Sequence, residues 1–199
     1  MKMKNIKMLL SLAVFALFGL ISCDESSEAG EFDNWQARNE QYIDSIATVA
    51  RANADGDWQV LLAEGLDPSK EWGNEYYVYC HIVEPGTGTS KPLFTDYVLV
   101  NYSGRLMPTL PTYPDGFQFD SSYTGGLNPS FNVPAELLLS GTVRGFYTAL
   151  QQMTDGAIWK VYIPYMLGYG VNGTTGIPGY STLVFDINLV SFSSSPTNN

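Results

Sequence analysis

The second half of the chain contains the stretch Val98–Gly104, which reads Val-Leu-Val-Asn-Tyr-Ser-Gly. Its apolar residues alternate with residues that point to the opposite face, and this period of two is typical of a half-buried β-strand. The same period recurs in Tyr77–Ile82 and in Leu183–Leu189. The three segments predict antiparallel strands that bury one face of a sheet in a common core.

A helical pattern lies between the last two of these strands. Val143, Phe146, Leu150 and Met153 fall on one face at helical spacing, and Gly156 suits the end of such a helix. The two periods together predict an α+β fold, in which a curved antiparallel β-sheet wraps around one short α-helix.

An amphipathic helix is predicted before the sheet, over about residues 33–54. Apolar residues recur there at helical spacing, and they are Phe32, Trp35, Tyr42, Ile43, Ile46, Val49 and Ala50. An isolated helix of this length is marginally stable in water, so its apolar stripe must pack against a partner. Two alternatives stay open, because that partner is either the chain's own sheet or the same helix of a second copy in a homodimer.

The first 22 residues are predicted to be an export signal. Three lysines precede an apolar run, Met8–Ile21, that is too short and too early for a membrane span. The run ends in Leu20–Cys23, which reads Leu-Ile-Ser-Cys and resembles a bacterial lipobox. This resemblance implies cleavage before Cys23 and a lipid on that cysteine, which would anchor the protein in a bacterial cell envelope, on the periplasmic face or at the outer membrane. The alternative is an ordinary secretory signal with an incidental cysteine.

The charge balance excludes some partners. Removal of residues 1–22 leaves seven of the ten basic side chains against all 20 acidic ones, a net charge near −13. A chain this acidic repels nucleic acid and anionic lipid headgroups, so we expect neither as a partner.

Side chains that usually carry catalysis or bind metals are scarce. His81 is the only histidine, so Ser-His-Asp and Cys-His mechanisms have little support. Cys80 and His81 are neighbours in a strand and point to opposite faces, so they cannot share a metal ion. With Cys23 acylated, Cys80 has no disulfide partner and is either a small apolar filler or a reactive thiol. We therefore expect no metal and no cofactor.

Six short segments occur in one order over the second half of the chain. They are Val98–Gly104, Phe119–Ser122, Val143–Phe146, Val161–Pro164, Tyr169–Gly170, and Ile177–Pro178 followed by Ser181–Phe185. Together they resemble the FKBP-type peptidyl-prolyl cis-trans isomerases, over about residues 76–192. The resemblance implies the α+β fold predicted above and an enzyme that rotates X-Pro bonds without a cofactor.

This activity suits a chain that is rich in aromatic residues and lacks a recognisable nucleophile. Rotation about an X-Pro bond is slow because it sacrifices amide resonance, at a barrier of roughly 18–20 kcal/mol. The planar amide is more dipolar than the twisted one, so an apolar pocket disfavours the starting state. Each reduction of the barrier by about 1.4 kcal/mol speeds the rotation tenfold.

The resemblance also implies a set of site residues. An apolar pocket for the proline ring would be lined by Tyr102, Phe119, Val133, Thr142, Val143, Phe146, Ile177 and Phe185, with Phe131 at its rim. Asp120 would be a buried carboxylate that polarises the surroundings of the amide and holds the Tyr102 hydroxyl. The Tyr169 hydroxyl and the Val143 backbone N–H would donate to substrate carbonyls. Taken singly, these residues are better interpreted as core or turn residues; their joint order reverses that preference and favours a site.

The chain is predicted to have five parts. These are a signal peptide (1–22), a tether (23–32), an N-terminal helical extension (33–75), an FKBP-type isomerase domain (76–192) and a C-terminal tail (193–199).

The favoured function is a peptidyl-prolyl isomerase that assists the folding of exported proteins, whose partners are unfolded or partly folded chains with exposed X-Pro bonds. Two alternatives stay open. One is a catalytically weak FKBP-like chaperone or peptide-binding lipoprotein, and the other is a polysaccharide-binding lipoprotein, which would not explain the ordered segments.

Overall fold

The computed structural model describes residues 30–197. The chain divides into two compact units, Met1–Asp33 and Asn34–Asn199, and every helix and strand below belongs to the second unit. The predicted signal peptide and the predicted lipid-bearing Cys23 lie outside the described residues.

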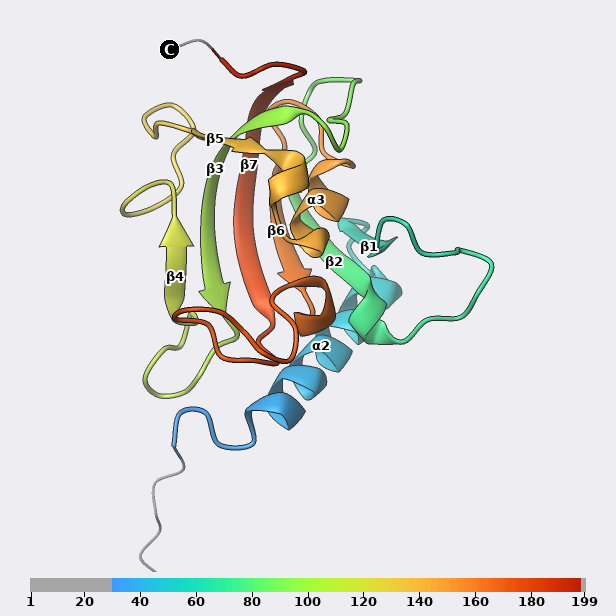
Figure 1. Ribbon diagram of the computed structural model, residues 1–199, viewed down its shortest axis with the longest axis vertical. Coiled ribbons are helices and arrows are strands. Elements are labelled where there is room, and N and C mark those ends of the chain that lie inside the picture. The colour runs from blue at the N-terminus through green and yellow to red at the C-terminus, as the bar shows by residue number, and fades with distance from the viewer. Residues whose placement is uncertain (1–29, 198–199) are drawn as a thin grey trace, which may run out of the picture. The chain divides into compact units, whose positions relative to one another are not determined.

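A single antiparallel sheet of seven strands forms the second unit (Figure 1). The strands are β1 (Trp58–Leu62), β2 (Tyr77–Glu84), β3 (Tyr97–Leu106), β4 (Gln118–Ser121), β5 (Ala135–Leu138), β6 (Ile158–Ile163) and β7 (Leu183–Ser193). Their order in the sheet is β1-β2-β6-β7-β3-β4, and β5 pairs with one end of β3. The predicted α+β fold with a curved antiparallel sheet is therefore confirmed, although β1 was not predicted.

Two α-helices and three short 3-10 helices accompany the sheet. They are α2 (Trp35–Ala52), η1 (Asn74–Tyr76), η2 (Leu139–Gly141), α3 (Arg144–Leu150) and η3 (Tyr165–Leu167). Among the described residues no helix is long and apolar enough to cross a membrane.

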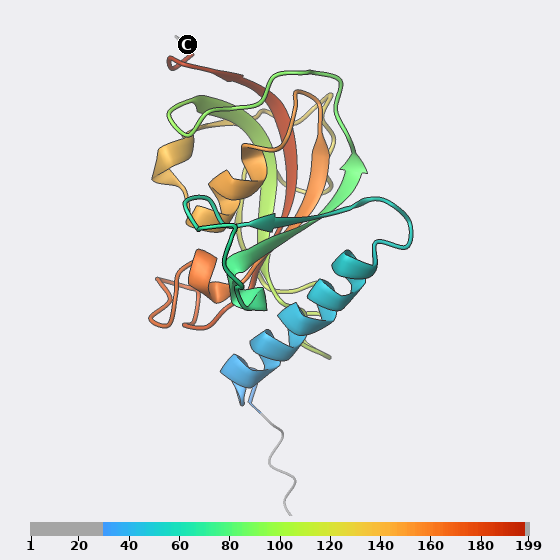
Figure 2. The ribbon, with the colours of Figure 1, turned by 90° about the vertical axis from the view of Figure 1, so that its right-hand side faces the viewer.

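The short helix α3 packs against the concave face of the sheet (Figure 2). Its Phe146, Ala149 and Leu150 are buried in one core with alternate residues of the strands, such as Val161. Gly145 allows the close approach, because a Cβ there would lie 2.3 Å from Cγ2 of Ile163. Burial of each large apolar side chain contributes roughly 1.5–3 kcal/mol, so this core supplies most of the folding free energy.

The long helix α2 packs against the opposite face. Its buried residues recur every three or four positions, and they are Trp35, Asn39, Ile43, Ala47 and Ala50. Ile43 and the two alanines contact Tyr79, which points away from the α3 side of β2. Of the two alternatives for the apolar stripe, the described chain uses docking on its own sheet. The stripe is also shifted from the predicted one, because Val49 is 53% exposed.

Candidate functional site

Four aromatic rings meet between α3 and the concave face of the sheet. Phe185 of β7 lies at the centre, with ring centroids 5.1 Å from Phe146 of α3, 5.6 Å from Phe119 of β4 and 6.3 Å from Tyr102 of β3. Gly104 of β3 makes room for them, since a Cβ there would lie 2.6 Å from the Phe185 ring and 2.7 Å from the Phe119 ring. The structure thus brings together the four rings that the sequence placed in the pocket.

One polar contact joins this cluster to the carboxylate of Asp120, which is exposed and not buried as expected. The Tyr102 hydroxyl donates a hydrogen bond of 2.7 Å to Oδ2 of Asp120. The pKa of the Tyr102 hydroxyl is raised above its usual value, chiefly by burial. The hydrogen bond to Asp120, the charge of Asp120 and the nearby Tyr169 raise this pKa further, in that order. The phenol therefore stays protonated at neutral pH and remains a donor to Asp120.

The two serines after Asp120 brace this pair. The Ser121 backbone N–H donates to Oδ1 of Asp120 at 2.8 Å, so both carboxylate oxygens are occupied. The Tyr102 backbone N–H donates to the Ser122 hydroxyl at 2.9 Å, and the Ser121 hydroxyl donates to the Tyr102 carbonyl at 3.1 Å. The segment Phe119–Ser122 thus holds the Tyr102 main chain and its side chain at the same time.

Val143 lies just before the start of α3, the helix that carries Phe146 of the ring cluster. Its extended backbone places it just before the helix, and its carbonyl accepts from the Phe146 N–H at 2.9 Å. Among the described residues no backbone carbonyl accepts the Val143 N–H. That donor is therefore available to a ligand, as are donors at the start of other helices.

A hollow of about 330 Å³ opens beside the aromatic cluster. It is lined by Phe117, Gln118, Phe119, Asp120, Tyr169, Thr174, Thr175, Gly176 and Ile177. Tyr169 is 40% exposed and Ile177 is buried, and both lie on the loop between η3 and β7. The hollow contains four of the expected site residues, whereas Tyr102, Phe146 and Phe185 do not line it.

Three expected pocket residues do not line this hollow. Phe131 and Val133 are 84% and 81% exposed on the loop before β5. The Thr142 hydroxyl donates a hydrogen bond to the Leu139 carbonyl at 2.8 Å. The role of these three residues stays a prediction.

Two parts of the hollow were missed by the sequence analysis. Phe117 and Gln118 precede the recognisable Phe-Asp-Ser-Ser segment, and Thr174–Gly176 precedes the Ile-Pro pair. Their adjacency to those segments is the only signal in the sequence that would have found them.

A second cluster lies apart from the rings, at the turn between α2 and β1. Ligand atoms of Asp55, Asp57 and His81 lie within 4.8 Å of one another, and the two aspartates are exposed. Only Cys80 and His81 were considered as a metal-binding pair from the sequence, so this group was not predicted. Cys80 itself is fully buried, which raises the pKa of its thiol well above the usual range and fits the apolar filler alternative.

Known proteins that are similar to this chain belong to the family that the six segments resemble. A family model described as FKBP-type peptidyl-prolyl cis-trans isomerase matches residues 88–190. The chain is 39% identical over 111 residues to the peptidyl-prolyl cis-trans isomerase Mip of Coxiella burnetii, a match that covers 55% of this chain and 42% of that protein. The chain spans less than half the length of three of the curated relatives that it matches.

Two solved structures are similar over longer stretches. A peptidyl-prolyl cis-trans isomerase from Pseudomonas syringae superposes with a TM-score of 0.55 at 28% identity, over 79% of this chain and 96% of that chain. FkpA from Escherichia coli superposes with a TM-score of 0.51 at 25% identity, over 98% of this chain and 75% of that chain.

Proposed function

Because the chain belongs to the family of FKBP-type peptidyl-prolyl cis-trans isomerases, we propose that it catalyses the rotation of X-Pro peptide bonds. The observation that carries this proposal is the meeting of Tyr102, Phe119, Phe146 and Phe185 beside a hollow that holds Asp120 and Tyr169. These rings offer an apolar surface for a proline ring, and the polar groups stand at its edge.

In the proposed mechanism the pocket acts on the amide without forming a covalent bond. The apolar rings replace water around the planar, dipolar amide and so disfavour it relative to the twisted form. The Val143 N–H and the Tyr169 hydroxyl donate to substrate carbonyls on either side of the proline. Asp120 accepts the Tyr102 hydroxyl and thereby holds one wall of the pocket at a fixed angle.

The proposed substrates are exposed X-Pro segments of exported proteins that are not yet folded. The export signal and the lipobox-like segment that ends at Cys23 support a lipid-anchored protein of the cell envelope. Replacement of Cys23 by Ser should abolish lipid labelling and membrane association. Unchanged labelling would contradict the anchor.

Catalysis is tested with a protein that starts near Asp24 and lacks the leader. We expect it to accelerate cis-trans isomerisation of X-Pro peptides above the spontaneous rate in a protease-coupled assay. A bulky apolar residue before proline should be preferred, because it would rest against the apolar side chain of Ile177. A folded protein that fails to accelerate any peptide of a varied panel would support the weak chaperone instead.

A further inference from the structure

The helix α2 reaches the loop that carries Tyr169 and Ile177, residues 164–182. Oδ1 of Asn39 accepts the Thr182 backbone N–H at 2.7 Å, and Nε1 of Trp35 donates to the Ser181 hydroxyl at 3.0 Å. Both contacts join residues more than 140 positions apart in the sequence. The end of the loop is therefore held by a helix that lies outside the region matched by the family model.

Asn39 is suited to this contact because both ends of its buried amide are hydrogen-bonded. The side chain is 1% exposed, and its Nδ2 donates to the Trp35 carbonyl at 2.8 Å while Oδ1 takes the Thr182 N–H. A buried amide that loses one partner carries a large cost, so the observed orientation is strongly preferred. The Asn39 contact thus fixes the position of the Thr182 backbone relative to α2.

The loop transmits this position to Tyr169. The Tyr180 backbone N–H donates to the Gly170 carbonyl at 3.0 Å, which joins the residue before Ser181 to the residue after Tyr169. The loop is also closely packed on itself, since a Cβ on Gly179 would lie 2.0 Å from the Val171 carbonyl oxygen. A loop bonded in this way moves as one piece when its anchor moves.

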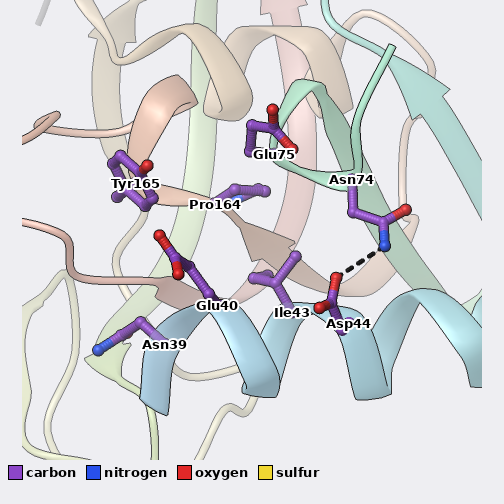
Figure 3. A pocket seen from close by; sticks show the side chains of 8 residues that line it. All are labelled: Asn39, Glu40, Ile43, Asp44, Asn74, Glu75, Pro164 and Tyr165. Carbon is purple, nitrogen blue, oxygen red and sulfur yellow. Dashed lines mark hydrogen bonds between the residues drawn. The ribbon is translucent and has the colours of Figure 1, made fainter. Parts of the chain in front are cut away.

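A hollow of about 290 Å³ separates this anchor from a second polar contact of α2, that of Asp44 (Figure 3). Ile43 and Pro164 line it between the two contacts. At its far end Nδ2 of Asn74 donates to Oδ1 of Asp44 at 2.8 Å, which ties α2 to η1 rather than to the loop. The two contacts can therefore be cut separately.

We propose that Asn39 is a positioning residue, which acts through the loop to hold the Tyr169 hydroxyl at the site. This inference rests on the proposed function, in which Tyr169 contacts substrate. It assigns the N-terminal helix a part in catalysis on short peptides, although the helix does not itself touch the site.

The test compares Asn39→Ala in two backgrounds. In the wild-type background we expect kcat/KM for X-Pro peptides to fall about threefold or more, and in the Tyr169→Phe background by less than about twofold, because coupled residues are non-additive. The matched control Asp44→Ala should leave kcat/KM unchanged in both. Equal losses for Asn39→Ala in both backgrounds would overturn the proposal.

Amide hydrogen exchange gives a readout that does not depend on activity. Asn39→Ala should speed the exchange of residues 169–177 at a temperature where the sheet stays protected, and Asp44→Ala should not. If Asn39→Ala fails to fold, Asn39→Leu keeps a side chain of similar volume and removes the acceptor of the Thr182 N–H. Unchanged amide exchange in the folded variant would overturn the proposal, whether or not the wild-type protein is an active isomerase. A lack of isomerase activity in the wild-type protein would refute the proposed function separately.

Discussion

The two helices that cover the sheet do so in different ways. On the concave face, α3 inserts the large side chains Phe146 and Leu150 into an apolar core, where they are 3% and 0% exposed. On the other face, α2 lays the small residues Ala47 and Ala50 against Tyr79, and it makes polar contacts with the loop and with η1.

The two faces therefore have different roles, because one mainly stabilises the fold and the other mainly positions the loop that carries Tyr169. Burial of apolar side chains is non-directional, whereas hydrogen bonds to a buried amide are satisfied in few geometries. The α3 face carries the larger apolar burial and the pocket rings. The α2 face contributes less burial per residue, yet it determines where the loop with Tyr169 lies.

The largest effect is expected when the α3 face is broken. Leu150→Ala removes a fully buried side chain and leaves a cavity, which should lower the free energy of unfolding by about 2–5 kcal/mol. Val49→Ala on α2 makes a comparable truncation at a residue that is 53% exposed and should cost no more than about 0.5 kcal/mol. Urea unfolding of both variants measures the contrast; similar costs would mean that the two faces are not divided in this way.

The next effect concerns the site rather than the fold. Asp120→Ala removes the acceptor of the Tyr102 hydroxyl, and we expect kcat/KM for X-Pro peptides to fall by about five- to a hundredfold, equivalent to roughly 1–3 kcal/mol. Because Asp120 is exposed, the melting temperature should change little. Asp115→Ala removes a nearby exposed carboxylate and serves as the control. Equal kinetics in the two variants would exclude a role for Asp120.

A smaller effect appears at alkaline pH. Burial raises the pKa of Tyr79 from 10.0 to about 12, and its hydroxyl donates to the Asn74 carbonyl at 2.9 Å. Above pH 10 the unfolded chain loses this proton first, so the stabilisation that is complete below pH 10 is lost as pH rises toward 12. We expect the melting temperature of the wild-type protein to fall between pH 10 and pH 12. In Tyr79→Phe the fall should be less steep, once the difference in melting temperature between the two proteins at neutral pH is subtracted. An identical slope would exclude Tyr79 as a source of the decline.

Strands and rings could be predicted from the sequence because their signals are local or ordered. Alternation in Val98–Gly104 defines a strand by itself, and Phe119 and Phe185 stand in recognisable segments. The buried face of α2 was harder to predict, since Asn39 and Ala47 are polar or small and score poorly in an apolar stripe. Asn39 is buried against a loop more than 140 positions away in the sequence, and Ala47 is buried against Tyr79 of β2.

The strand β1 was not predicted, and the positions of Phe131 and Val133 rested on weak evidence, for related reasons. Trp58–Leu62 is short and follows a helix, and only its antiparallel pairing with β2 identifies it as a strand. Phe131 and Val133 were placed in the pocket by resemblance alone. Neither case contains a local period that would have decided it.

The smallest effect expected is on the oligomeric state. The buried face of α2 already packs against Tyr79, so the helix has little apolar surface left for a second copy, and Val49 is its largest exposed apolar side chain in the described helix. We therefore expect the protein without its leader to sediment as a monomer, and Val49→Asp to leave the sedimentation coefficient unchanged. A dimer that this substitution converts to a monomer would show that α2 serves both its own sheet and a partner. In that case the exposed side of α2 would be the interface, and the buried side would still hold the loop.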